Sequence, residues 1–243
     1  MTHNLRFVAV LMALAIAGIL VACADGETGT SEPLAVSCAN IKALDSYRYT
    51  INVKLKVASE IPTPTSSSQT PAGAFTDDLN ALLSDFTIDG AYIAPDHTTA
   101  ILRFQDDEVE LRAIGTESWE RLGNTWHPRD EPVEDISLLT PDVVCNDTVR
   151  GLAPSFADVK PTNETVQGIK TRRYHLDKAD IVLPPGARST VPETYQVDLW
   201  IAKEGLWPVQ LEISAAATAE RFSMEFQDIN DPGIRIDEPT VSP

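Results

Sequence analysis

Apolar and polar side chains alternate without interruption through residues 47–57 (YRYTINVKLKV). Successive side chains of a strand point to opposite faces, so this pattern predicts a long strand with one face in a core and the other in water. Strands with one wet face are typical of antiparallel sheets, because parallel sheets are usually buried on both faces. We therefore expect a domain built around an antiparallel sheet.

Further strands follow at short intervals along the chain. Gly123-Asn124 is typical of a two-residue hairpin turn, and Asp106-Asp107 and Lys203–Gly205 are expected to turn two other pairs. The sequence predicts about ten strands in all. Besides 47–57, they are expected at 86–94, 98–105, 108–115, 117–122, 125–127, 164–167, 170–177, 194–202, 207–217 and 220–229.

Short helices are expected at 38–45, 77–84 and 141–152, and loops rich in Pro, Ser, Thr and Gly at 60–75 and 184–193. A sheet of about ten strands curls or needs a cover. The fold class we expect is α+β but mainly β. It is a strongly curved antiparallel half-barrel sheet with a few short helices covering its concave face.

The N-terminus has the layout of a secretory signal. Arg6 supplies the positive charge, an apolar run follows from Phe7, and small residues precede Cys23 in Leu20-Val21-Ala22-Cys23. A cysteine in the first position after cleavage is what a bacterial lipobox requires. Its thiol receives a diacylglycerol, and the new amine can take a further acyl chain such as palmitate. An uncleaved transmembrane anchor and a non-lipidated signal are the alternatives, although the run is short for a span of about 20 residues.

We therefore expect residues 1–22 to be a lipoprotein signal peptide, 23–37 a lipidated tether and 38–243 a single domain. The mature protein would be extracytoplasmic and anchored to the cell membrane through Cys23. Two or more acyl chains suffice for stable anchoring, where one chain is marginal.

The charge balance is strongly acidic, with 36 Asp and Glu against 19 Lys and Arg, for a formal net charge of −17. Residues 1–22 contain one Arg and no acid, so 18 basic residues would remain after cleavage. Such a balance argues against binding to nucleic acid and to anionic lipid surfaces. Ordinary solubility is the simplest reason for it.

Two cysteines remain once Cys23 is assigned to lipid. Cys38 and Cys145 form an even pair in an exported chain, which favours a disulfide. Two separate buried thiols are the alternative. A metal site is not favoured, because the two cysteines are far apart and no pair of histidines lies near them.

Nothing in the sequence favours an enzyme. His97, His127 and His175 are far apart, and the chain has no GxSxG, P-loop or HExxH motif. We therefore expect no catalytic residues, no metal and no cofactor.

Apolar stripes on the predicted strands are the residues that could bind a ligand. Each stripe is one strand face aimed at a common interior, and ligand pockets are mostly apolar. The alternative is that the helices fill this interior and leave no cavity. Trp119, Trp126, Trp200 and Trp207 could lie at a rim or simply pack. The predicted lining consists of Ile51, Val53, Leu55, Val109, Leu111, Val197, Leu199, Ile201, Leu211, Ile213, Phe222, Met224 and Phe226.

Several short sequence segments resemble those of a known family. They are the lipobox at Cys23, the strand 47–57 after a short helix, Gln167-Gly168 followed by Tyr174-His175-Leu176, and the stretch Val197–Val209 (VDLWIAKEGLWPV). The chain resembles bacterial lipoprotein carriers of the LolA/LolB type, and more closely the LppX/LprG-type lipid-binding lipoproteins. The resemblance covers about residues 40–230 and rests on no catalytic motif.

This resemblance implies a half-open β-barrel with helices in its mouth and a hydrophobic cavity. Members carry acyl chains of lipids or lipidated proteins across an aqueous space. The chain departs from the soluble shuttles because it is itself expected to be lipidated, which favours lipid capture near one membrane. We expect a lipid-binding or lipid-transfer lipoprotein. The alternative is an envelope sensor or protein-interaction module with the same fold, an unknown protein partner and no lipid cargo.

Overall fold

The computed structural model describes residues 33–54, 85–104, 107–129, 140–145, 150–182, 194–217 and 219–241. The expected signal peptide, the two loops at 60–75 and 184–193, the helix at 77–84 and Leu55 lie outside these residues. The expectations for those segments stay predictions.

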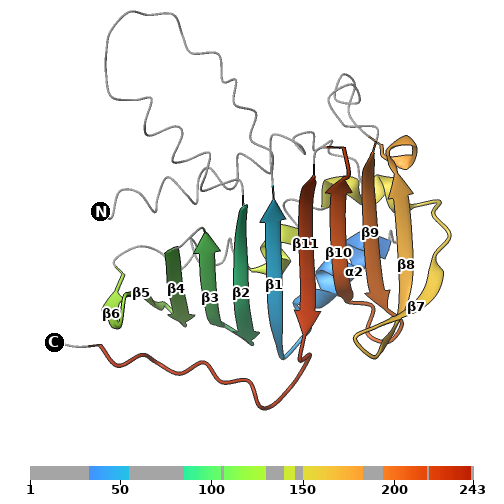
Figure 1. Cartoon of the computed structure of the whole chain (residues 1–243). Coiled ribbons are helices and arrows are strands. Elements are labelled where there is room, and N and C mark those ends of the chain that lie inside the picture. Colours follow the sequence, from blue (N-terminus) through green and yellow to red (C-terminus); the bar gives the residue numbers. More distant parts are fainter. Residues whose placement is uncertain are drawn as a thin grey trace, which may run out of the picture.

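Eleven strands form a single antiparallel sheet in the order β6-β5-β4-β3-β2-β1-β11-β10-β9-β8-β7. The sheet is open, because its outermost strands β6 and β7 lie at opposite ends (Figure 1). The mainly β half-barrel class expected from the sequence is confirmed. The strands are β1 Ser46–Lys54, β2 Asp85–Ile93, β3 His97–Phe104, β4 Asp107–Ile114, β5 Glu117–Leu122, β6 Thr125–Pro128, β7 Thr162–Val166, β8 Ile169–Asp177, β9 Tyr195–Ala202, β10 Pro208–Ala215 and β11 Glu220–Gln227.

The first strand lies in the middle of the sheet, next to the last. β1 pairs with β2 on one side and with β11 on the other, so two meanders of consecutive hairpins meet at the β1–β11 pair. Each predicted strand is present within about three residues of its expected limits, with the end of the 47–57 strand beyond Lys54 outside the described residues.

The first described helix, α2 (Pro33–Ile41), begins earlier than the helix expected at 38–45. Pro33 suits the first turn, where its missing N–H would have no partner in any case. Leu34, Cys38 and Ile41 follow at helical spacing and are all fully buried. Residues 33–37, which were expected in the tether, are therefore helical.

The helix predicted at 141–152 consists of two short pieces. The first is α5 (Pro141–Val143), and the helical backbone continues from it through Cys145. The second is the 3₁₀ helix η2 (Arg150–Phe156), which contains Pro154. Proline lacks an N–H and breaks the α-helical ladder, which explains why a long α-helix does not form here. A further 3₁₀ turn, η3 (Lys178–Asp180), follows β8.

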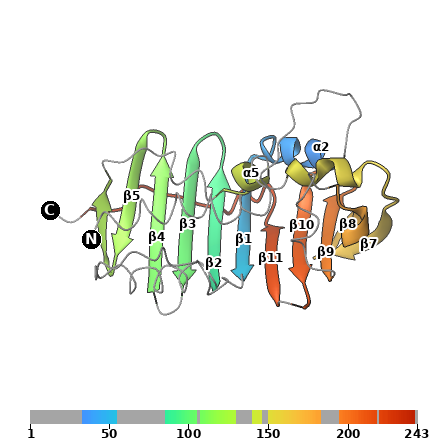
Figure 2. The same ribbon diagram turned by 90° about the horizontal axis from the view of Figure 1, so that it is seen from above.

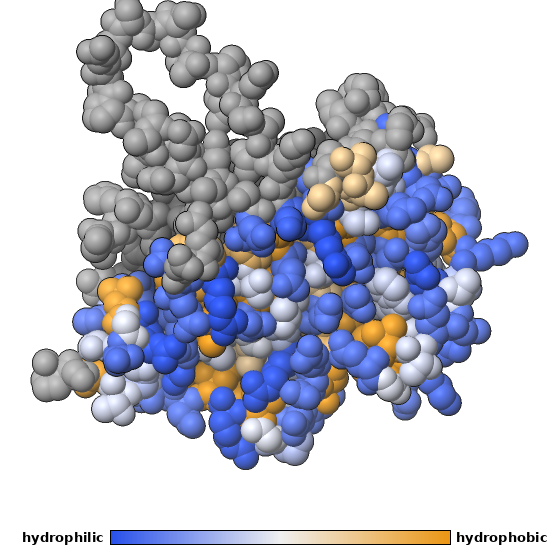
Figure 3. Space-filling view, viewed as in Figure 1, coloured by the Kyte–Doolittle hydropathy of each residue, from blue (hydrophilic) through white to orange (hydrophobic). Residues whose placement is uncertain are grey.

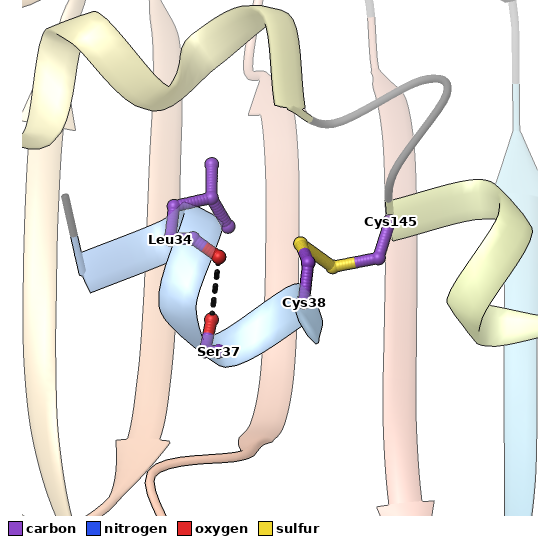
Figure 4. Close-up of a disulfide and its surroundings, with 4 residues drawn as sticks. All are labelled: Leu34, Ser37, Cys38 and Cys145. Atoms are coloured by element: carbon purple, nitrogen blue, oxygen red, sulfur yellow. Dashed lines mark hydrogen bonds between the residues drawn. A yellow bond between two sulfur atoms is a disulfide. The ribbon is translucent and has the colours of Figure 1, made fainter. Parts of the chain in front are cut away.

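The helices lie on one side of the sheet, over the half that contains β1 and β8–β11 (Figure 2). The predicted disulfide is present: Cys38 of α2 is bonded to Cys145, with the two Cα atoms 5.5 Å apart (Figure 4). Beside it, the Ser37 hydroxyl donates to the carbonyl oxygen of Leu34 at 2.9 Å. The disulfide therefore ties α2 to the segment of α5 across 107 residues of sequence.

The opposite side of the sheet is mostly hydrophilic (Figure 3). Arg121 bridges Glu108 and Glu110 at 3.2 and 2.9 Å, and Arg103 pairs with Glu108 at 3.0 Å and with Asp89. These ion pairs join β2, β3, β4 and β5 on the water-facing side.

The C-terminal segment runs back from β11 toward the β6 end of the sheet (Figure 1). Ile234 and Ile236 are buried there and form a small second cluster with Ala91 of β2. Arg112 donates to the carbonyl oxygen of Asp237 at 2.6 Å. This segment therefore packs on the first meander of the sheet.

No helix among the described residues has the length and apolar character needed to cross a membrane.

Candidate functional site

The side of the sheet beneath the helices is one continuous apolar face. Strand register brings apolar side chains into rows that run across the strands, which is where neighbouring side chains of a sheet contact one another. One such row crosses eight strands, from β4 to β8. Its members are Val109, Leu102, Ile88, Ile51, Met224, Leu211, Leu199 and Tyr174.

A second apolar row runs beside the first. It crosses seven strands, from β3 to β8, and is buried for most of its length. Its members are Phe104, Phe86, Val53, Phe222, Ile213, Val197 and Leu176. Together the two rows give the face its width.

The residues predicted to line a ligand site lie on this face, and those described belong to one hydrophobic cluster. Val109 and Ile213 are partly buried, and the other described members of that set are buried. Sequence reasoning missed Phe86, Ile88 and Leu102, although the alternation in residues 86–94 and 98–105 carries the signal for them. The prediction of a shared face is therefore confirmed by the register. Whether these residues contact a ligand stays a prediction.

The half of the face formed by β8–β11 is closely packed under helices. α2 contacts β10 and η2 contacts β8. Leu34, Ile41 and Phe156 are fully buried, and the Phe156 ring meets the Tyr174 ring edge-on at 6.3 Å between centroids. Figure 4 shows α2 and the disulfide lying across these strands. In this half, the helices fill the interior.

A third row of the face, which includes Tyr49 of β1, has two small residues where it crosses β2 and β3. Gly90 pairs with Ala100 of β3 on one side and with Tyr49 of β1 on the other. A Cβ at Gly90 would lie only 2.2 Å from the Tyr49 ring, so this position excludes every other residue while the ring stays in place. The Tyr49 ring thus lies over the glycine and extends from β1 across β2.

Aromatic rings cluster where the two halves meet. Tyr47 stacks on Tyr92 with ring centroids 5.2 Å apart and contacts Phe226 at 5.4 Å and Tyr49 at 6.1 Å. Burial raises the pKa values of Tyr47 and Tyr49 well above the ordinary value for tyrosine, and the charge of Asp142 raises both further. Both phenols therefore stay protonated at every physiological pH.

The Tyr49 hydroxyl has no hydrogen-bond partner among the described residues, although the side chain is only 2% exposed. In contrast, the Tyr92 hydroxyl donates to the carbonyl oxygen of Pro95 at 2.7 Å. Buried polar groups are nearly always hydrogen-bonded, so the lone hydroxyl is unusual.

The tryptophans and histidines do not converge on this face. Trp119, Trp200 and Trp207 are buried, which agrees with packing roles. Arg112 lies over the Trp126 ring at 4.5 Å, a cation–π contact. Within the described ranges, no group of His, Cys, Asp and Glu could hold a metal ion.

A polar cluster on the water-facing side of β7–β9 surrounds Glu164. The Trp200 indole N–H donates to Glu164 at 2.8 Å, and Arg173 pairs with Glu164 at 3.2 Å and with Asp198 at 2.8 Å. The hydrogen bond from Trp200, together with Arg173, lowers the pKa of Glu164. His175 also contacts Asp198, at 2.8 Å.

An open pocket of about 770 Å³ lies at one end of the sheet, between the β7–β8 and β9–β10 turns and the end of β11. It contains none of the predicted lining residues. Its lining mixes apolar and acidic groups: Gln167, Ile169, Glu204, Trp207, Gln227, Asp228 and Ile229.

Neither a protein-family model nor a curated protein matches the chain. Solved structures similar to it include the lipoprotein LppX of Mycobacterium tuberculosis, at 16% identity and a TM-score of 0.48 over 84% of this chain and 96% of that one. LprF of Mycobacterium bovis is 16% identical, with 88% and 99% covered and a TM-score of 0.47. A LolA superfamily protein of Nitrosomonas europaea is 10% identical, with 86% and 96% covered and a TM-score of 0.30.

These neighbours come from the groups that the sequence resembles. With identities this low and TM-scores below 0.5, the likeness carries no conclusion about ligand or partner. A function has to be argued from this chain's own residues.

Proposed function

We propose that this protein is a membrane-anchored, extracytoplasmic lipoprotein that binds or transfers lipid acyl chains on the apolar face of its open sheet. No enzymatic activity is part of the proposal. The observation that carries it is the apolar row from Val109 to Tyr174, which crosses eight strands of a sheet that is not closed into a barrel. An acyl chain removed from water there gains about 0.8 kcal/mol for each CH₂ group.

The proposed anchor is close to the domain. Pro33, where α2 begins, comes ten positions after Cys23. A fully extended chain of that length spans roughly 35 Å. Lipid at Cys23 would therefore hold the sheet near one membrane surface, which suits local capture of lipid better than long-range shuttling.

The acyl-chain site is best placed over β2–β4 and the adjoining side of β1, at the border of the half that the helices cover. The β8–β11 half is already packed by α2 and η2, so Val197, Leu199, Ile201, Leu211, Ile213, Phe222, Met224 and Phe226 serve mainly as core against those helices. The proposed lining is then Ile51, Val53, Val109 and Leu111, extended by Ile88 and Leu102 of the same face.

Native mass spectrometry with lipid extraction tests this proposal. The full chain would be expressed in a bacterial host, purified from membranes in detergent and measured for bound lipid in addition to the acyl groups on Cys23. We expect a stoichiometric lipid that exchanges with added acyl lipids. A ligand-free mass that takes up no acyl lipid would contradict the proposal.

A matched pair of variants locates the site. Val109→Trp fills space on the apolar face of β4 and is expected to lower lipid occupancy. Ile101→Trp changes β3 on the water-facing side, because Ile101 pairs with Glu110 and Asp89 there, and should leave occupancy unchanged. Equal effects from both variants would place the lipid elsewhere.

The closely packed half favours a second function, an envelope sensor or protein-interaction module with no lipid cargo. A folded chain without bound lipid, which also fails to bind acyl probes, is the outcome that this alternative predicts.

A further inference from the structure

The lone Tyr49 hydroxyl lies inside the proposed acyl-chain site. Its side chain is 2% exposed, and the oxygen has no hydrogen-bond partner among the residues that the structure describes. A buried hydroxyl left without a partner costs free energy, because it gives up its bonds to water and receives nothing in return. A partner brought by a ligand would remove that cost.

The position of the hydroxyl relative to Gly90 and Ala100 shows where such a partner would lie. The oxygen is 2.4 Å from the point that a Cβ of Gly90 would occupy, so it lies above β2 and not above β11. Beyond Gly90, the next residue in the row is Ala100 of β3. The hydroxyl therefore extends over β2 toward the small residue Ala100, away from the strands packed under α2.

The hydroxyl acts as a hydrogen-bond donor. Burial and the charges of Asp142 and Asp89 raise the pKa of Tyr49, so the proton stays on the oxygen. No acceptor among the described residues forms a hydrogen bond with it. A ligand carbonyl on the apolar face would supply the acceptor that the described residues do not.

We infer that the Tyr49 hydroxyl donates a hydrogen bond to the carbonyl oxygen of an acyl ligand, an ester or an amide. This inference rests on the proposed function and deepens it. The hydrocarbon chain would lie along the apolar rows, and the carbonyl would be fixed above Gly90. Tyr49 would then set how deeply the chain enters and would distinguish acyl from alkyl lipids.

A matched pair of lipids tests this directly. 1-Palmitoylglycerol and 1-O-hexadecylglycerol have the same headgroup, but only the first has a carbonyl. Native mass spectrometry of the full chain in detergent gives the apparent affinity for each. We expect the ester to bind about 2- to 12-fold more tightly, as a hydrogen bond would give, and Tyr49→Phe to abolish this preference while the ether still binds.

Tyr174→Phe is the control, because Tyr174 lies on the same apolar face but under η2, against Phe156. It should keep the preference for the ester. A wild-type protein that binds both lipids equally, or a Tyr49→Phe protein that keeps the preference, would overturn the inference and leave the proposed function standing. A wild-type protein that binds neither lipid would overturn both.

A second measurement separates a ligand carbonyl from an internal water molecule. If the hydroxyl has no partner in the delipidated protein, Tyr49→Phe should leave its Tm unchanged or raise it, because an unpaired polar group is removed. A Tm lowered by several degrees, more than in Tyr174→Phe, would mean that a buried water already satisfies the hydroxyl and would overturn the inference.

Discussion

The two halves of the apolar face have the same alternation of apolar and polar side chains, but α2 and η2 pack on only one of them. Over β8–β11, the face is packed by α2 and η2 and tied by the Cys38–Cys145 disulfide. Over β2–β4, Gly90 and Ala100 leave room for the Tyr49 ring, whose hydroxyl has no partner among the described residues. The difference teaches that strand alternation makes one continuous apolar face, while the positions of α2 and η2 decide which part of it packs against helices.

Removing the disulfide should have the largest effect, and it should act on the packed half. Cys38→Ser combined with Cys145→Ser opens a loop of 107 residues, which is expected to lower the free energy of unfolding by about 4–5 kcal/mol in the chain-entropy model. Urea denaturation measures this change. A loss below about 1 kcal/mol would mean that α2 is held by packing alone.

Truncating leucines in the two halves sharpens the comparison. Leu211→Ala in the packed half should cost about 2–5 kcal/mol of unfolding free energy, because Leu211 is fully buried in β10, a strand that α2 contacts. Leu102→Ala in the other half should cost less stability but remove more bound lipid. Thermal unfolding and native mass spectrometry, run on both variants, give the two readouts, and the reverse ranking would contradict the division of roles.

Gly90→Ala tests the close approach of Tyr49. The new Cβ would lie 2.2 Å from the ring, so the ring or the strand has to shift, at an expected cost of about 1–3 kcal/mol. The same substitution should cost less in a Tyr49→Val background, where the ring is absent. Gly233→Ala is the control, because its Cβ would meet only the side chain of Asp231, in an exposed segment. Additive effects of the first two substitutions would contradict the contact.

The smallest effect is expected at Glu164, on the water-facing side. Its pKa is lowered, so its contribution to stability is present above the pKa of the unfolded chain, near 4.5, and is lost as the pH falls through the lower folded value. The Tm of the wild type should therefore exceed that of Glu164→Gln at pH 6, and the difference should shrink as the pH falls below about 4.5. Glu225→Gln on β11 is the control for removing a surface carboxylate, since Glu225 has no ion pair among the described residues.

The sequence predicted the strands well, because alternation in stretches such as 47–57 follows directly from the geometry of a half-buried strand. The sequence-based prediction placed the start of α2 too late. The polar residues Ala24–Ser31 favoured a tether that reached residue 37, so the helical spacing of Leu34, Cys38 and Ile41 was overlooked. The residue that indicates the true start of the helix is Pro33, because proline suits a first helical turn.

The lone hydroxyl and its glycine could not be predicted in the same way. Tyr49 and Gly90 are 41 positions apart, and their contact depends on the register between β1 and β2. Alternation shows which face a side chain is on, but it does not show which residue lies opposite. The difference between the half packed under α2 and η2 and the other half has the same origin, because it depends on where these two helices lie.

Photo-crosslinking with a fatty acid that carries both a diazirine and an alkyne tests the central claim most directly. Bacteria expressing the full chain would be fed this acid and irradiated, and the labelled peptides would be mapped by mass spectrometry, with label on Cys23 and unirradiated cells as references. The account predicts light-dependent label in β1–β4, concentrated around Tyr49, Ile88, Leu102 and Leu111. Label confined to Cys23, or concentrated on β8–β11, would contradict it.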